Sequence, residues 1–151
     1  MKRSGLSWVI AALITVVLIT VKQGYAEQET EGSCTLATLQ GLYVFDATGY
    51  NITPSGPQPK AIVEVLGFKG DGTLTSLATR SVNGVVARGI VGTGSYTVAT
   101  DCTGTLTFNP QGPHFDIFIA PTGKEIHMIQ TDANTVLAGV TRKVSQPEHG
   151  D

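Results

Sequence analysis

The sequence predicts an all-β protein, a single up-and-down antiparallel β-barrel of about eight strands joined by hairpins. Three observations predict it. Short segments of strand composition alternate with Gly-, Pro-, Asn- and Asp-containing turns, and nearly every connection has the length of a hairpin. No segment shows the apolar period of a helix convincingly. A meander of hairpins favours closure into a barrel, because closure leaves no exposed strand edges.

The expected strands follow one another at short intervals. They are 42–47, 61–68, 73–80, 85–91, 95–99, 104–108, 114–120, 125–131 and 135–143. Asn83-Gly84 is the strongest hairpin signal, because this pair accepts the positive φ angles of a tight turn. Residues 48–60 contain three prolines and two glycines, so we expect a long loop there.

Strand periodicity places alternate residues on opposite faces of a sheet. In the segment 61–68, Ile62, Glu64 and Leu66 share one face, and Val63 and Val65 share the other. Both faces are mostly apolar, whereas a sheet with one solvated face shows a cleaner apolar–polar alternation. We therefore expect a filled barrel interior and an outer surface covered by loops or by other subunits, which is a weak signal of a homo-oligomer.

The first 26 residues have the three parts of a secretory signal peptide. Lys2 and Arg3 give a positive start, residues 8–21 form an apolar run, and Gly24 and Ala26 supply the small residues of a cleavage site. A membrane anchor is the alternative, but this run spans about 21 Å as a helix, against roughly 30 Å for the hydrocarbon core. We expect cleavage, no stable membrane anchor afterwards, and a secreted or periplasmic protein.

The chain then divides into a signal peptide, a flexible arm, one β-barrel domain and a flexible tail, at 1–26, 27–33, 34–144 and 145–151. All 12 acidic residues follow the leader, whereas three of the 10 basic residues precede the cut, so cleavage moves the formal net charge from −2 to −5. This acidic balance argues against nucleic-acid binding, which needs a basic face to neutralise phosphates.

The two cysteines, Cys34 and Cys102, predict a disulfide. An even number of cysteines in an exported protein is typical of a structural bond. A bridge between them closes a long loop, for which chain-entropy arguments give about 4 kcal/mol. The alternative, a catalytic thiol, needs a nearby base, and none is adjacent in the sequence.

Several segments together resemble a known group of proteins. They are 39–45 (LQGLYVF), 67–74 (GFKGDGTL), Asn83-Gly84, 94–106 (GSYTVATDCTGTL) and the terminal Thr141-Arg142, and the most specific part is Asp101-Cys102-Thr103-Gly104. Through them the chain resembles small exported bacterial proteins related to the allene oxide cyclase barrel-like group, within the calycin-type barrels. The resemblance covers most of residues 34–144.

The resemblance implies an eight-stranded barrel with a central apolar cavity. Some members of the group are cyclases or isomerases acting on oxygenated lipids or polyketides, but no catalytic motif of the cyclases maps onto this chain residue by residue. The lipocalin branch opens with Gly-x-Trp, where this chain has Gly41-Leu42-Tyr43. Arg142 could stack over the aromatic residue of the first strand and close one end of the barrel.

Glu64 lies among apolar residues of a strand that is expected to be buried. If it points inward, desolvation raises the pKa of its carboxyl group and makes it a candidate general acid or base. Tyr96 and His127 are the candidate assisting residues. The structural alternative for Glu64 is a cross-strand partner of Arg80 or Arg88, or an outward side chain at a wet site.

Glu125 and His127 are two residues apart and therefore share one face of a strand, with His114 expected on a neighbouring strand. Two histidines and a carboxylate can bind zinc or orient a proton transfer, but the hairpin register decides whether they meet. A surface or hydrogen-bonded position is the simpler interpretation of His127. We predict neither a metal site nor a cofactor.

Aromatic residues are the candidate lining of a ligand cavity: Tyr43, Phe45, Phe68, Phe108 and Phe115. As a plain packed core they need no ligand. The first hypothesis is an exported barrel that binds a small apolar or amphipathic molecule, because an eight-stranded barrel is about wide enough to hold one small ligand.

Two further hypotheses stay open. One is a cofactor-independent cyclase or isomerase, in which Glu64 transfers a proton with Tyr96 or His127 assisting. The other is an interaction module with a fully packed barrel, whose contact surface is the loop 48–60. An inward Glu64 in an apolar pocket favours the enzyme, and a cavity without a titratable group favours the binder.

Overall fold

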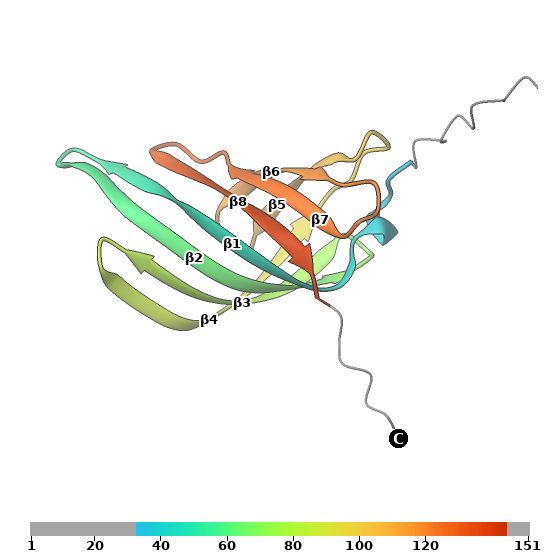
Figure 1. The fold of residues 1–151 in the computed structure, drawn as a ribbon, viewed down its shortest axis with the longest axis horizontal. Helices are drawn as coiled ribbons and strands as arrows, with labels where there is room; N and C mark the ends of the chain where they lie inside the picture. The colour runs from blue at the N-terminus through green and yellow to red at the C-terminus, as the bar shows by residue number, and fades with distance from the viewer. Residues whose placement is uncertain (1–32, 145–151) are drawn as a thin grey trace, which may run out of the picture.

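Eight antiparallel strands in sequence order close into one barrel (Figure 1). The structure, a computed structural model, describes residues 33–144; the expected signal peptide, nearly all of the arm and the tail lie outside the described residues. The strands are β1 (Gln40–Thr53), β2 (Gly56–Lys69), β3 (Thr73–Val82), β4 (Val85–Tyr96), β5 (Thr103–Phe108), β6 (His114–Ile119), β7 (Glu125–Gln130) and β8 (Thr135–Lys143). The predicted up-and-down barrel is confirmed.

One end of the barrel is closed by the chain itself. A short 3₁₀ helix, Leu36–Thr38, lies at this end, where β1 starts and β8 ends (Figure 1). The hydroxyl of Tyr96 donates to the carbonyl oxygens of Leu36 and Leu39, both at 3.1 Å. The hydroxyl of Tyr43 donates to the carbonyl of Gly123 at 2.6 Å. These bonds satisfy two buried phenols. Those of Tyr96 hold residues 36–39, called the plug below, against the strands, and that of Tyr43 holds the β6–β7 turn.

The predicted alternation of inward and outward residues is confirmed on β2 and β6. Glu64, Leu66 and Phe68 are buried on β2, and Phe115 and Ile117 are buried on β6. Behind the plug, tightly packed aromatic rings fill the closed half of the barrel. Edge-to-face contacts join Tyr43 to Phe68 and Phe68 to Tyr96, each at 5.1 Å between ring centroids. The interior is therefore filled at this end.

The predicted loop 48–60 is wrong, because this segment is a paired hairpin. β1 continues to Thr53 and pairs with β2 from Gly56 onward. The carbonyl of Pro59 accepts a hydrogen bond from the Asn83 amide, so Pro59 faces β3. Pro57 faces the same way, beyond the end of the β2–β3 ladder, which stops at Lys60 and Val82. Neither proline nitrogen is therefore needed in the ladder with β1.

Two predicted strands, 85–91 and 95–99, correspond to one. β4 runs without a break from Val85 to Tyr96, so the barrel has eight strands rather than nine. The glycines between the two segments do not interrupt it. At Gly92 a Cβ atom would lie 2.7 Å from the Ser76 hydroxyl, which explains why a residue without a side chain stands there.

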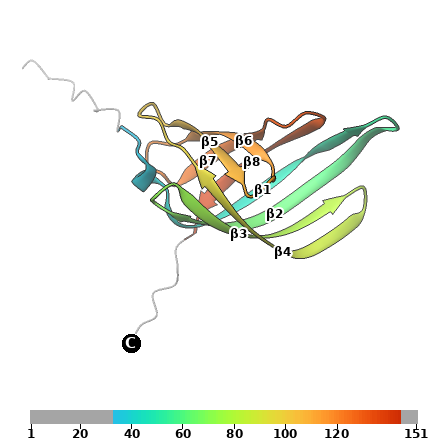
Figure 2. The same ribbon diagram turned by 180° about the vertical axis from the view of Figure 1, so that it is seen from behind.

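β4 and β5 form the shortest seam of the barrel. They share three residue pairs, from Gly94↔Phe108 to Tyr96↔Leu106, whereas β1 and β2 pair over their whole length. Figure 2 shows the β3–β4 hairpin turning away from β5 and β6 beyond this seam. The long hairpins β1–β2 and β3–β4 extend past the shorter strands opposite the closed end (Figure 1), and this end of the barrel is called the mouth below.

Cys34 and Cys102 form the predicted disulfide. It ties the start of the described chain to the turn before β5. A disulfide indicates a non-reducing compartment. Among residues 33–144, the structure has no helix that is both long and apolar enough to cross a membrane.

The expected stacking of Arg142 on the first strand is wrong. Arg142 stands opposite Val44 and Lys143 stands opposite Tyr43, so strand alternation turns the arginine to the outer face. The ammonium group of Lys143 lies 5.7 Å from the centroid of the Tyr43 ring and makes the cation–π contact instead.

Candidate ligand-binding pocket

A cavity of about 190 Å³ lies in the barrel mouth, beside the β4–β5 seam. Inward side chains of β2, β3 and β4 form one wall, and the ends of β5 and β6 form the other. The apolar lining comes mainly from Ile62, Ala78, Ile90, Phe108 and Phe115. The polar groups in it are Glu64, Ser76, Arg80 and Asn109. The barrel is thus packed at its closed end and hollow at its mouth.

Glu64 is the buried carboxyl group of this pocket. Its side chain points inward from β2, and the residue is 8 % exposed. Burial raises the pKa of Glu64, and the hydrogen bond with the Ser76 hydroxyl offsets part of that rise. The cross-strand neighbour is Ala78 rather than an arginine, and no ion pair involving Glu64 is formed within residues 33–144. A carboxyl group in this environment can donate a hydrogen bond when protonated and accept one when ionised.

The burial of Glu64 predicts that stability falls as the pH rises. A carboxyl group with a raised pKa in the folded protein binds its proton more tightly there than in the unfolded chain. Ionising the buried carboxyl group destabilises the folded protein. This destabilisation is absent at pH values below the ordinary pKa of 4.5 and complete at pH values above the raised pKa. Relative to the Glu64→Gln variant, the wild type is expected to lose free energy of unfolding as the pH is raised from 4 to 8 in urea titrations. A constant difference over this range would contradict the burial of an ionisable group.

The five predicted cavity aromatics fall into two groups. Phe108 and Phe115 line the pocket, with their ring centroids 6.1 Å apart and edge to face. Phe45 lies behind Phe115 at 5.9 Å and supports it from the core. Tyr43 and Phe68 belong to the packed closed end and are not in the pocket lining.

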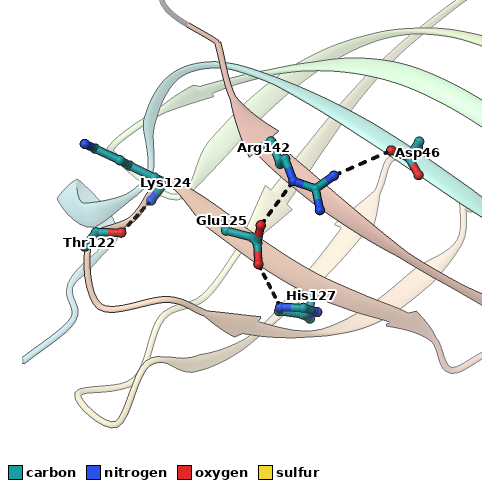
Figure 3. Close-up of polar contacts among 6 residues, drawn as sticks. All are labelled: Asp46, Thr122, Lys124, Glu125, His127 and Arg142. Carbon is teal, nitrogen blue, oxygen red and sulfur yellow. Dashed lines mark hydrogen bonds and ion pairs between the residues drawn. The ribbon is translucent and has the colours of Figure 1, made fainter.

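Tyr96 and His127 do not join Glu64. Tyr96 holds the plug at the closed end through its two hydrogen bonds. His127 is exposed on the outer face of β7, where its ring nitrogen lies 3.1 Å from a Glu125 oxygen. Figure 3 shows the Glu125 carboxylate between His127 and Arg142, with Arg142 reaching on to Asp46. Of the three residues predicted to act together, Glu64 alone lines the pocket.

The register also separates the two histidines. His127 stands opposite Phe118, whereas His114 lies four residues earlier on β6 and bonds to Asp132. Within the described residues, no three His, Cys, Asp or Glu side chains gather closely enough to hold a metal ion.

Two basic residues lie at the rim of the pocket. Lys60 belongs to the segment expected to be a loop, and Arg80 is the residue that the sequence offers as a cross-strand partner of Glu64. Arg80 lines the pocket and also a second hollow of about 310 Å³, which it shares with Lys60. Lys60 is in phase with Ile62 and Glu64 on β2, and Arg80 stands opposite Ile62 on β3. The period of two could therefore have placed both side chains on the inner face, had residues 48–60 been recognised as part of a hairpin.

A chain of hydrogen bonds crosses the mouth from Lys60. Its ammonium group donates to Gln130 at 3.2 Å, and the Gln130 amide donates to Asp132 at 2.7 Å. Asp132 also accepts from the His114 backbone at 2.9 Å and contacts its ring nitrogen at 2.7 Å. Burial opposes ionisation of Asp132, but these hydrogen bonds outweigh it and lower its pKa to about 2.

The low pKa of Asp132 predicts an acid-sensitive contribution to stability. The ionised Asp132 carboxylate, whose pKa is lowered by folding, stabilises the folded protein at pH values above the ordinary pKa of 3.8. This contribution is lost as the pH falls towards about 2. The destabilisation caused by Asp132→Asn is expected to shrink as the pH of the urea titrations is lowered from 5 to 2. Asp116→Asn is the control, because Asp116 is exposed and accepts no side-chain hydrogen bond within residues 33–144. Equal acid dependence of the two variants would contradict the assignment.

Comparison with known proteins gives no match: no protein family, characterised protein or solved structure is significantly similar to the chain. The functional assignment therefore depends on the geometry of the pocket.

Proposed function

We propose that this protein is an exported β-barrel that binds a small apolar or amphipathic ligand in the pocket at the barrel mouth. The observation that carries the proposal is a cavity of about 190 Å³ with apolar walls and one buried carboxyl group. Apolar lining with a few convergent polar groups is typical of small-molecule sites. A packed interior, as at the closed end, would leave no room for a ligand.

Export is supported by two features. The disulfide between Cys34 and Cys102 needs a non-reducing compartment to persist. The charge and apolar pattern of residues 1–26 is that of a secretory signal peptide. We infer a secreted or periplasmic location, where the barrel meets ligands outside the cytosol.

Ligand binding can be tested with p-cresol, a neutral probe with one ring. Titration of the ¹⁵N-labelled protein is expected to shift the amide resonances of Ile62, Ala78 and Phe115 but not that of Ile126 at the closed end. Ala78→Leu adds a side chain that fills the pocket and is expected to abolish these shifts.

Thr79→Leu is the matched control for this experiment. It introduces the same side chain one residue along β3, where Thr79 is exposed. Shifts retained in Thr79→Leu and lost in Ala78→Leu place the probe in the pocket. Absence of shifts in the wild type, or equal shifts in both variants, would rule out binding there.

Catalysis is the second candidate function, and the inward Glu64 favours it. A single buried carboxyl group can remove a proton from a carbon acid and return it to another carbon of the same molecule. We infer that such an activity would be a cofactor-independent isomerase or cyclase of oxygenated lipid-like or polyketide-like compounds. Tyr96 and His127 would take no part, because neither faces the pocket.

The isomerisation of 3-cyclohexenone to 2-cyclohexenone tests this activity with a substrate of one ring. Glu64 would accept the proton from the carbon between the carbonyl and the double bond, and return it to the far alkene carbon. Conversion by the wild type above the rate in buffer, with none in Glu64→Gln, supports catalysis. Equal rates for the two proteins would contradict catalysis and leave ligand binding as the proposed function.

Self-association is also proposed, from the outer face of β2, β3 and β4. Val65, Leu77 and Val91 stand opposite one another and are 38 %, 52 % and 78 % exposed. A continuous apolar row of this kind is unusual on a monomer. Native mass spectrometry of the protein is expected to show a homo-oligomer, and Leu77→Lys is expected to convert it to a monomer.

A further inference from the structure

The rim of the pocket carries two positive charges on one inner face. Arg80 and Lys60 lie on neighbouring strands and both line the hollow outside the pocket. Within residues 33–144, neither side chain forms an ion pair. Lys60 donates only to the neutral amide of Gln130, at 3.2 Å. Burial, and after it the charge of Arg80, lower the pKa of Lys60, while the carboxylate of Asp132 offsets part of this effect.

Two neighbouring cations without a carboxylate between them favour an anionic group from outside. An anion between Lys60 and Arg80 relieves their repulsion and forms charge-assisted hydrogen bonds with both. The guanidinium of Arg80 suits a carboxylate in particular, because its planar donors match the two oxygens. Since Arg80 lines the pocket as well as the outer hollow, an anion at the rim is continuous with a ligand inside.

The volume of the pocket limits the apolar part of the ligand. At about 190 Å³ it slightly exceeds the roughly 150 Å³ of an apolar protein cavity that binds benzene. One six-membered ring fits, whereas a long acyl chain would extend out of the pocket. Phe108 and Phe115 already meet edge to face, and a third ring can extend this arrangement with similar geometry.

Two polar side chains inside the pocket can contact a substituent of the ring. Glu64 and Ser76 both line the cavity and are mostly buried. A hydroxyl or carbonyl group on the ring can exchange a hydrogen bond with one of them and compensate for its own desolvation. The pocket therefore offers cationic, apolar and hydrogen-bonding groups to one ligand.

We propose that the ligand is a single-ring aromatic anion, with its anionic group between Lys60 and Arg80, its ring against Phe108 and Phe115, and a polar ring substituent at Glu64. This inference rests on the proposed binding function and adds the chemical class of the ligand. It predicts a preference for charge at one end of the molecule and for a hydroxyl group at the other.

Two probes of the same shape test the charge. They are 3-(4-hydroxyphenyl)propanoate and its neutral analogue 3-(4-hydroxyphenyl)propan-1-ol. In calorimetric titrations at low salt the anion is expected to bind at least about tenfold more tightly, as charge-assisted hydrogen bonds predict. Raising the ionic strength is expected to reduce this ratio, because salt screens charges near the surface.

Arg80→Gln is expected to bring the anion-to-alcohol affinity ratio close to one, because it removes the charge that the anionic group contacts. Arg88→Gln removes the same charge from β4 outside the lining of either hollow, and is expected to keep the wild-type ratio. An equal effect of both variants would mean that net charge, rather than this rim, attracts the anion, and would overturn the proposal.

The remaining probes separate failure of this inference from failure of the binding function. Binding of p-cresol without any preference for the anion overturns the ligand class and leaves the proposed function standing. Absence of binding by every one-ring probe overturns both. Dodecanoate that binds tenfold more tightly than the hydroxyaryl anion would show that a chain occupies the pocket, and would overturn the ring assignment.

Removal of the ring hydroxyl, as in 3-phenylpropanoate, is expected to weaken binding to the wild type and to weaken binding to Glu64→Leu by a smaller factor.

Discussion

Removal of the Cys34–Cys102 disulfide is expected to lower the free energy of unfolding by about 4 kcal/mol. The two cysteines are separated by 68 positions in the sequence, so the bond closes a loop that contains β1 to β4. Opening this loop gives the unfolded chain much more freedom and leaves the barrel contacts in place. Because domains of this size are stable by only about 5–15 kcal/mol, the loss is a large part of the total.

The measurement is urea unfolding of the double variant Cys34→Ala/Cys102→Ala against the oxidised wild type. A second double variant, with Cys102→Gly, is expected to be about 1 kcal/mol more stable than the alanine one. Cys102 has a φ of 64°, a backbone conformation that favours glycine. Its turn matches that at Gly72: Asp101 accepts from Thr103 as Asp71 accepts from Thr73. A loss below 1 kcal/mol for the alanine variant would contradict the role of loop closure.

Phe45→Ala is expected to cost about 3–5 kcal/mol, the second-largest effect. Phe45 is 0 % exposed and packs edge to face on Phe115. Its removal leaves a void that the surrounding strands can fill only in part, because their positions are fixed by the barrel ladder. Phe115 forms the wall between this void and the pocket, so the variant is also expected to accept larger ring systems than the wild type.

Phe118→Ala is the matched control for this substitution. Phe118 lies three residues from Phe115 on β6, but it is on the outer face and 53 % exposed. Urea unfolding of both variants is the measurement, and truncation of Phe118 is expected to change the free energy of unfolding by less than about 0.5 kcal/mol. Comparable losses for the two variants would contradict the inward and outward assignment of β6.

The alternation of residues predicted the part of the site that lies on β2. A strict period of two places Glu64 with Leu66 and Phe68, and the structure shows all three inside. The Asn83-Gly84 pair predicted the β3–β4 turn from local conformation alone, with both residues at positive φ. These features depend on neighbouring residues, and a sequence contains that information directly.

Features that depend on register between distant strands could not be predicted. Tyr96 and His127 qualify chemically as partners of Glu64, but the closed end holds the first and the outer face holds the second. The prolines of 48–60 predict a loop, although Pro57 and Pro59 face the side of β2 that needs no amide donor. The inward position of Lys60 follows only from the paired hairpin, so a loop at 48–60 gives no indication of it.

The short seam between β4 and β5 separates access to the pocket from the stability of the whole protein. Three residue pairs join these strands, and the pocket lies directly beside them. Backbone hydrogen bonds from Asn109 to Thr93 and from Thr97 to Thr105 flank these pairs. Parting the three pairs leaves the disulfide, the plug and the long β1–β2 ladder intact. If the proposed binding function holds, ligand exchange is expected to follow local opening of this edge rather than global unfolding. Amide hydrogen exchange is expected to be faster along the seam than at the centre of β1.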